Sequence, residues 1–180
     1  SGPHRGGTSA EAARQHAYQL AQAQGLVFVH PYDDEAIAAG QGTLALEMLA
    51  AQPDLETLIV SVGGGGLIAG VATAAKALKP DIEIIGIQTE RFAAMLNAVR
   101  GTTYPMGAST IAEGIAVGAP GLIAQEVVGR LVDDLLLVDE GDIEQAVLML
   151  LEIEKTLVEG AGAVGLAALS RYRERFAGKK

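Results

Sequence analysis

The sequence predicts an α/β protein of three layers, in which a mostly parallel sheet carries helices on both faces. Short, almost continuous apolar runs alternate along the chain with longer segments of helical pattern. Strands of that kind are typical of parallel sheets that are covered on both sides, because every position of such a strand is buried. A run of glycines also follows one apolar segment and precedes a helical one, as in a strand–turn–helix unit.

The first half of the chain alternates helix and strand from its start. Thr8 and Glu11 fit a capping box that opens the first helix, and Asp33 or Asp34 caps the second. Pro80 ends the third helix, since proline cannot continue one. The expected elements are a helix at 8–24, a strand at 26–29, a helix ending at 51, a strand at 58–62, a helix at 67–78 and a strand at 82–87.

The second half is less regular in its middle. Glycine, proline and threonine interrupt the pattern after residue 100, which predicts a loop and then an irregular stretch. Asp139 stands where it would cap the helix that follows the last strand. The expected elements are a helix at 91–99, a loop at 101–107, an irregular stretch with a short helix at 108–121, a helix at 122–131, a strand at 135–138, and helices at 139–158 and 160–176.

Composition narrows the function classes. The 180 residues, of which 49% are hydrophobic and 19% charged, predict a single folded α/β domain over 1–180, with residues 1–7 read as a tag remnant or a disordered end. A net charge of −9 argues against nucleic acid as a partner. The chain has no cysteine, which excludes disulfides, thiolate nucleophiles and cysteine metal sites.

Hydropathy argues against a membrane protein. No apolar run reaches the roughly 18 residues that a membrane-spanning helix needs. The first seven residues also lack the apolar core of a signal peptide. We therefore expect no membrane partner and a cytoplasmic location.

The most informative segment is Ser61–Gly70, in which four consecutive glycines separate an apolar run from a helical stretch. Glycine lets a ligand approach the main chain, and the start of a helix presents free N–H groups and the positive end of a dipole. Together these features predict a phosphate site, with a tight turn without ligand as the structural alternative. Gly64-x-Gly66-x-x-Ala69 also fits the dinucleotide pattern with Glu90 as the ribose-binding acid, although that motif usually opens a nucleotide domain.

Five stretches, in order and with matching spacing, make the interpretation more specific. They are His30-Pro-Tyr-Asp-Asp34, Gly40-Gln-Gly-Thr-Leu-Ala-Leu-Glu47, Val62-Gly-Gly-Gly-Gly-Leu-Ile-Ala-Gly70, Thr110-Ile-Ala-Glu-Gly-Ile-Ala116 and Val158-Glu-Gly-Ala-Gly-Ala163. From about Gly7 to Lys180 the chain resembles the threonine dehydratase and serine racemase-like family, which are pyridoxal-phosphate enzymes of the tryptophan-synthase β-subunit fold. It resembles only an internal-to-C-terminal segment of the catalytic domain, so the sheet is expected to be incomplete relative to that domain.

The resemblance implies pyridoxal phosphate as the cofactor. In that family the glycine loop binds the cofactor's phosphate, and the matching residues here are Gly63, Gly64, Gly65, Gly66 and Leu67. The pair Glu113-Gly114 matches an Asp-Gly pair beside the cofactor, and Glu159 matches a glutamate near its ring. For Glu159, the end of a long helix or a helix cap is an equal alternative.

Other polar residues receive structural roles. His30 and Tyr32 lie in what the resemblance describes as a strand-to-helix turn, with Asp33 and Asp34 as helix caps. Gly40-Gln-Gly-Thr43 is read as close helix packing.

A metal site is not expected. Serine racemase-like members hold a divalent cation whose carboxylate ligands would align with Gln88 and Ala94 of this chain. Hard cations prefer charged oxygen ligands, which these two residues do not supply.

The resemblance also implies a Schiff-base lysine in an N-terminal segment. None of the chain's five lysines suits that role, so no catalytic residue is assigned. We expect a segment of a threonine or serine dehydratase (an ammonia-lyase) that is inactive alone and binds pyridoxal phosphate weakly or not at all. The alternative is a non-catalytic phosphate- or nucleotide-binding α/β module.

The expected partners follow from the same interpretation. The parent family acts on an amino-acid substrate. A partial sheet exposes a strand edge and an apolar face, so we expect self-association or a complementing N-terminal segment.

Overall fold

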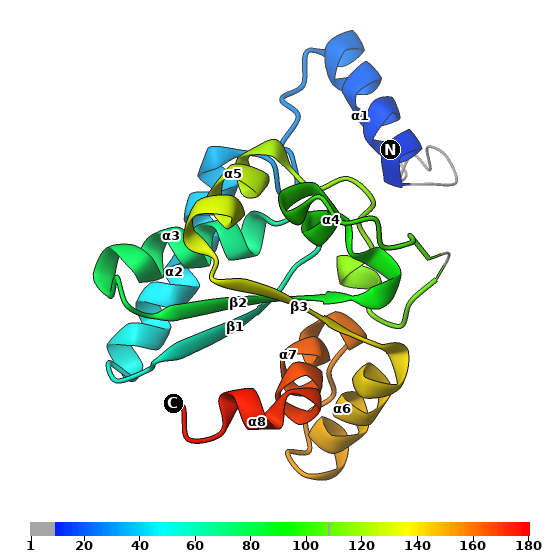
Figure 1. Ribbon diagram of the computed structural model, residues 1–180. Helices are drawn as coiled ribbons and strands as arrows, with labels where there is room; N and C mark the ends of the chain where they lie inside the picture. The colour runs from blue at the N-terminus through cyan, green and yellow to red at the C-terminus, as the bar shows by residue number, and fades with distance from the viewer. Residues whose placement is uncertain (1–9, 108) are drawn as a thin grey trace. The chain divides into compact units, whose positions relative to one another are not determined.

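The computed structural model describes residues 10–107 and 109–180, which form two compact units, up to His30 and from Pro31 to Lys180. Each unit is described by itself below (Figure 1). The capping residue Thr8 and the proposed tag remnant at 1–7 lie outside the described residues. The expectation of one domain over 1–180 stays a prediction.

The first unit contains the expected first helix, α1 (Ala10–Gln24). Gly25 turns the chain with a φ of 65°, and the ring of Tyr18 on α1 packs 4.1 Å from that of Phe28. The strand predicted at 26–29 is wrong, because this segment has no regular secondary structure. A strand needs a hydrogen-bonded neighbour, and the described residues of this unit offer none. Val27 is accordingly 90% exposed.

The second unit has the predicted α/β architecture. Its elements are, in order, α2 (Glu35–Ala51), β1 (Thr57–Ser61), α3 (Gly66–Leu78), β2 (Glu83–Thr89), η1 (Glu90–Phe92), α4 (Ala94–Arg100), η2 (Glu113–Ile115), α5 (Leu122–Leu131), β3 (Asp134–Val138), α6 (Glu140–Glu152), α7 (Gly160–Arg171) and α8 (Arg173–Phe176). Among the described residues of both units, no helix is long and apolar enough to cross a membrane.

The three strands form a parallel sheet in the order β1-β2-β3. Ile59 pairs with Ile85 between β1 and β2, and Gly86 pairs with Leu135 between β2 and β3. Because all three strands are parallel, their carboxyl ends open at one edge of the sheet. In open α/β sheets that edge is where ligands bind.

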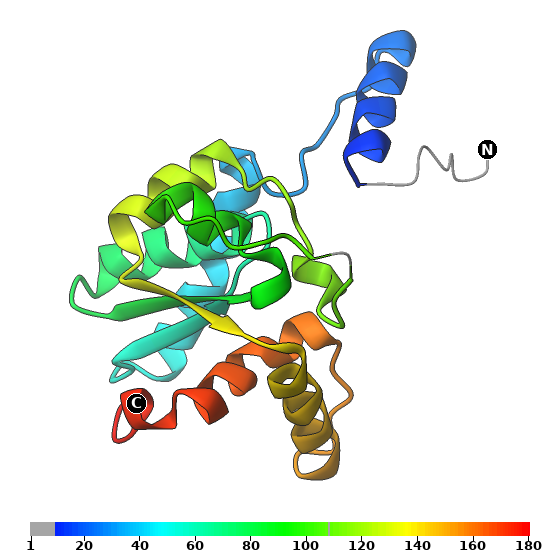
Figure 2. The same cartoon turned by 45° about the vertical axis from the view of Figure 1, so that its right-hand side comes forward.

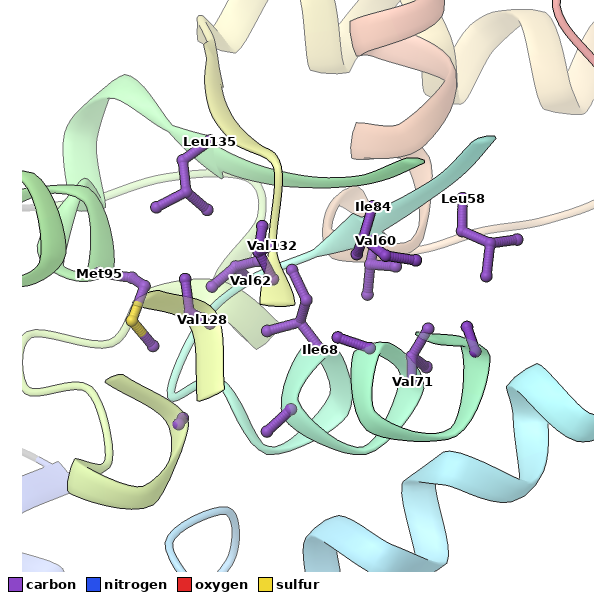
Figure 3. Packing of buried hydrophobic residues seen from close by; sticks show 14 of the residues in the cluster. Leu58, Val60, Val62, Ile68, Val71, Ile84, Met95, Val128, Val132 and Leu135 are labelled. Atoms are coloured by element: carbon purple, nitrogen blue, oxygen red, sulfur yellow. The ribbon is translucent and has the colours of Figure 1, made fainter. Parts of the chain in front are cut away.

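Helices cover both faces of the sheet, as Figures 1 and 2 show. On one face α2, α3, α4 and α5 enclose an apolar cluster, and Figure 3 shows Ile68 and Val71 of α3 beside Leu58 and Val60 of β1. On the other face a second cluster lies under α6 and α7 and includes Ile87 of β2. These two cores confirm the predicted three layers.

Three helix boundaries differ from the expected ones. The segment expected as one helix at 91–99 is split into η1 and α4, because the side chain of Thr89 caps η1. Helix α6 ends at Glu152, six residues early, and Lys155 then takes a left-handed φ of 57°. The last helix breaks at Tyr172, whose hydroxyl donates to the Leu137 carbonyl at 2.7 Å.

Asp133 ties the start of β3 to its neighbours. Its carboxylate accepts hydrogen bonds from the Ile84 N–H at 2.7 Å and from Lys76 Nζ at 2.9 Å. Burial raises the pKa of Asp133, but these hydrogen bonds outweigh burial and hold the pKa below its ordinary value of 3.8. A carboxyl whose pKa is lowered by folding stabilises the fold above its ordinary pKa, and this contribution is lost as the pH falls through the folded-state pKa.

We therefore expect the free energy of unfolding to fall as the pH is lowered from about 5 to about 2. The slope should be shallower in Asp133→Asn, which keeps an acceptor for Ile84 but cannot ionise, and in Lys76→Met. Urea unfolding at a series of pH values measures the slope of the free energy of unfolding against pH. An Asp133→Asn slope equal to that of the unsubstituted chain would contradict the assignment.

Candidate functional site

A cleft of about 410 Å³ lies at the carboxyl edge of the sheet. It gathers segments that are far apart in the sequence. The lining residues are Pro31, Tyr32, Ser61, Gly63, Gly64, Gly65, Gly66, Leu67, Gly114, Ile115, Val117, Glu159, Ala161 and Gly162. The volume falls within the range of about 300–1,000 Å³ that is usual for small-molecule sites.

The glycine loop forms one wall of this cleft and leads into α3. Gly63 to Gly66 are buried, and Gly65 caps α3 with a left-handed φ of 97°. The first N–H groups of a helix have no partner within it, and the positive end of the dipole lies there as well. The loop therefore offers donors and a positive potential to an anion in this cleft.

Tyr32, at the start of the second unit, packs against the glycine loop. The ring of Tyr32 packs against Gly64, and its hydroxyl donates to the Ala119 carbonyl at 3.0 Å. The Gly121 N–H in turn donates to the Gly64 carbonyl at 2.9 Å. Tyr32 also lines the cleft, a position that the sequence pattern did not indicate.

The two aspartates that follow are helix caps, as predicted, but of different helices. Asp34 Oδ1 accepts from the N–H groups of Ala36 and Ile37 at the start of α2. Asp33 Oδ1 accepts from the N–H of Ile123 at 3.0 Å, at the start of α5. His30 lies in the first unit, where its ring contacts Phe28 edge-on at 6.0 Å.

Opposite segments complete the cleft; we call them the second wall, made of Gly114, Ile115, Val117, Glu159, Ala161 and Gly162. Glu159 is exposed and stands at the N-cap position of α7, where its side chain makes no capping hydrogen bond. It is therefore not the end of a long helix, since α6 stops at Glu152. Its carboxylate lies beside Gly114, whereas Glu113 is exposed at the start of η2 and outside the lining.

Glu140, the first residue of α6, lies outside the cleft lining and was not singled out from the sequence. Its carboxylate accepts from Thr110 Oγ1 at 2.6 Å, from the Ile111 N–H at 2.8 Å and from Thr89 Oγ1 at 3.1 Å. Burial raises the pKa of Glu140, but these hydrogen bonds outweigh burial and hold the pKa below its ordinary value. The carboxylate is thus held ionised beside the loop that leads to the second wall.

Gln88, one of the two positions considered above for a cation site, stands near the end of β2. Its side chain is fully buried and makes three hydrogen bonds. Nε2 donates to the Val62 and Phe92 carbonyls at 3.3 and 3.1 Å, and Oε1 accepts from the Leu96 N–H at 2.9 Å. The amide joins the residue before the glycine loop to η1 and α4 by hydrogen bonds.

The five lysines, all within the described residues, have partners outside the cleft lining. Lys76 pairs with Asp133, and Lys79 donates to the Leu55 carbonyl at 2.6 Å. The remaining three, Lys155, Lys179 and Lys180, contact the Glu152 carbonyl, Glu83 and Asp54 respectively.

The chain is similar to known enzymes, both in a family model and in individual relatives. Residues 4–180 match the family model described as pyridoxal-phosphate dependent enzyme. The L-threonine ammonia-lyase of Thermotoga maritima is 44% identical over 161 residues, which are 88% of this chain and 40% of that protein. The catabolic L-threonine dehydratase TdcB of Staphylococcus aureus is 45% identical over 165 residues, which are 91% of this chain and 48% of that protein.

Solved structures agree with the sequence relatives. Maize serine racemase superposes with a TM-score of 0.88 at 34% identity, over 97% of this chain and 56% of that one. The processed form of threonine deaminase isoform 2 from Solanum lycopersicum superposes with a TM-score of 0.88 at 32% identity, over 97% of this chain and 48% of that one. The chain thus spans about half the length of the relatives it matches. With a family match over residues 4–180, the chain belongs to the family of pyridoxal-phosphate dependent enzymes.

Proposed function

We propose that this chain carries the phosphate-binding half of a pyridoxal-phosphate site, in which Gly63, Gly64, Gly65, Gly66 and Leu67 hold the cofactor's phosphate. The observation that carries the proposal is the left-handed Gly65 at the start of α3, on a cleft of about 410 Å³. A phosphate carries up to two negative charges, which the free N–H groups and dipole of a helix start stabilise.

The second wall would then face the cofactor ring. Gly114 and Glu159 line the cleft, and Glu113 stands next to Gly114 in η2. The Glu159 carboxylate accepts hydrogen bonds or balances positive charge, so it would orient a ring edge that carries a proton. We assign these three residues to the ring side of the site.

The parent reaction is proposed to be the ammonia-lyase reaction after which two of the relatives are named. Pyridoxal phosphate, when bound, supplies an electron sink for such an elimination on an amino acid. In that reaction, this chain would bind the phosphate with the glycine loop and orient the ring with the second wall. Because its five lysines have partners elsewhere, we propose that the 180-residue chain alone is inactive and that a complementing segment would supply the amine.

Several expectations stay predictions. The apolar groove lined by Ala38, Gly42, Leu46, Ala74 and Val127 supports self-association, since exposed apolar grooves attract partners. A cytoplasmic location and the lack of a nucleic-acid partner likewise remain proposals. A nucleotide as ligand is less well supported, because Glu90, the acid that would hold the ribose, pairs with Arg171 at 3.2 Å.

Titration with pyridoxal phosphate tests the proposal, with amide NMR shifts as the readout. We expect weak binding that shifts the amides of Gly63 to Leu67 and that inorganic phosphate displaces, whereas pyridoxal without phosphate leaves those amides unchanged. Borohydride reduction in the presence of pyridoxal phosphate should attach the cofactor covalently to surface lysines only, as measured by mass spectrometry. Incubation with L-threonine should yield no oxo-acid. Unshifted amides at Gly63 to Leu67 would reject the phosphate site, and oxo-acid formation by rigorously purified chain would reject the inactivity.

A further inference from the structure

Glu140 is the first residue of α6, yet its carboxylate does not serve that helix. Asp139 and Asp142 already form a capping box there, in which Asp142 N donates to Asp139 Oδ1 at 2.9 Å and Asp139 N donates to Asp142 Oδ2 at 3.1 Å. The Glu140 side chain is only 18% exposed. Removing a carboxylate from water is costly unless hydrogen bonds replace the water, so the donors that surround it define its role.

Those donors come from two segments, the last residue of β2 and the loop between α4 and η2. Thr89 Oγ1, at the end of β2, donates at 3.1 Å. Thr110 Oγ1 and the Ile111 N–H, in the loop before η2, donate at 2.6 and 2.8 Å. Arg91 Nε lies 3.8 Å away and supplies a positive charge on the solvent side. Glu140 therefore joins the loop at 110–111 to the carboxyl edge of the sheet.

That loop carries the second wall. Thr110 Oγ1 also accepts from the Ala112 N–H at 3.1 Å, and the Ala112 carbonyl accepts from the Ile115 N–H at 3.0 Å. Ile115 packs closely against Gly63. A methyl group added to Gly63 would lie 2.9 Å from the Cα of Ile115. The position of the loop thus fixes how far Ile115 stands from the glycine loop.

The same loop meets the start of α7. A methyl group on Gly160 would overlap the Ile111 carbonyl oxygen and lie 2.7 Å from its carbon. Gly160 follows Glu159 directly, so the loop contacts the backbone next to Glu159 at the start of α7.

We infer that Glu140 is a positioning residue that holds the second wall at its distance from the glycine loop. This inference rests on the proposed function for its effect on cofactor affinity, but the arrangement of the wall is a property of the chain without ligand.

Hydrogen exchange and pyridoxal phosphate titration of the whole chain test it. In Glu140→Gln, an amide nitrogen replaces one of the oxygens that accept from Thr110 and Ile111. We expect the exchange of the Ile111, Ala112 and Ile115 amides to accelerate by about tenfold or more, since hydrogen bonds to a charged group are among the strong ones. Exchange in β1 and β2 should stay unchanged, and the affinity for pyridoxal phosphate should fall by about tenfold.

Matched variants separate positioning from general destabilisation. Thr110→Val should reproduce the local effect and Thr110→Ser, which keeps the hydroxyl, should restore the unsubstituted behaviour. Glu144→Gln makes the same change on an exposed side chain of α6 and should alter neither readout. Exchange at Ile111 and Ala112 equal to that of the unsubstituted chain, or raised equally in the sheet, would overturn the inference. If the unsubstituted chain does not bind pyridoxal phosphate, the proposed function fails, while the exchange data still decide the role of Glu140.

Discussion

Gly70→Ala is expected to lower the free energy of unfolding by about 3 kcal/mol, at the upper end of the usual cost of overpacking a core. Gly70 lies in α3 and faces the backbone of α2. An added methyl group would overlap the Ala38 carbonyl oxygen and lie 2.6 Å from the Gly42 nitrogen. Both obstacles are backbone atoms of one helix, so they cannot move aside as a side chain would. The whole of α2 would have to shift away from the core.

Gly40→Ala is the matched control. Gly40 is an exposed residue within α2 whose added methyl group would meet nothing within 4 Å. Alanine favours the helix over glycine, so this variant should be more stable by about 0.5–1 kcal/mol. Urea unfolding followed by circular dichroism measures both. Equal stabilities of the two variants would mean that α2 and α3 do not approach as closely as the structure has them.

Gly65→Ala is expected to weaken binding of pyridoxal phosphate or inorganic phosphate by about tenfold or more. A left-handed backbone such as the φ of 97° at Gly65 costs a residue with a side chain about 1–2 kcal/mol. The methyl group would also lie 2.5 Å from both Ala124 Cβ and Met95 Cε. The start of α3 would rotate or retreat, and its N–H groups would no longer converge on the cleft.

The control for this variant is Gly129→Ala, on the exposed side of α5, where the nearest atom would be 3.9 Å away. It should bind phosphate as the unsubstituted chain does. Titration by NMR, with the far-ultraviolet circular dichroism of each variant, separates lost binding from lost folding. A folded Gly65→Ala chain that binds phosphate with unchanged affinity would remove the glycine loop from the proposed site.

The glycine loop and the helix caps could be predicted from the sequence because they depend on interactions between residues that are close in the chain. A strand of apolar residues, a glycine turn and a helix start require only neighbours in the chain, as do the caps Asp34 and Asp139. The parallel pairing of the three strands also follows, since each strand is separated from the next by a helix.

The segment at 26–29 shows where local pattern misleads. Four apolar residues between turn signals are consistent with a strand, but a strand exists only if another strand pairs with it. Within its unit the described chain provides no such partner, so the segment packs Phe28 on Tyr18 instead.

By itself, the sequence determined the α/β class, the order of the helices and the β1–β3 strands, and the motifs that relate the chain to pyridoxal-phosphate dependent enzymes. Only the tertiary structure decided that Asp33 caps α5, 90 residues away along the chain, and that Glu140 holds a loop 30 residues before it. The reason is physical. Periodicity and capping depend on residues within a few positions, whereas a long-range hydrogen bond depends on how helices and loops pack together.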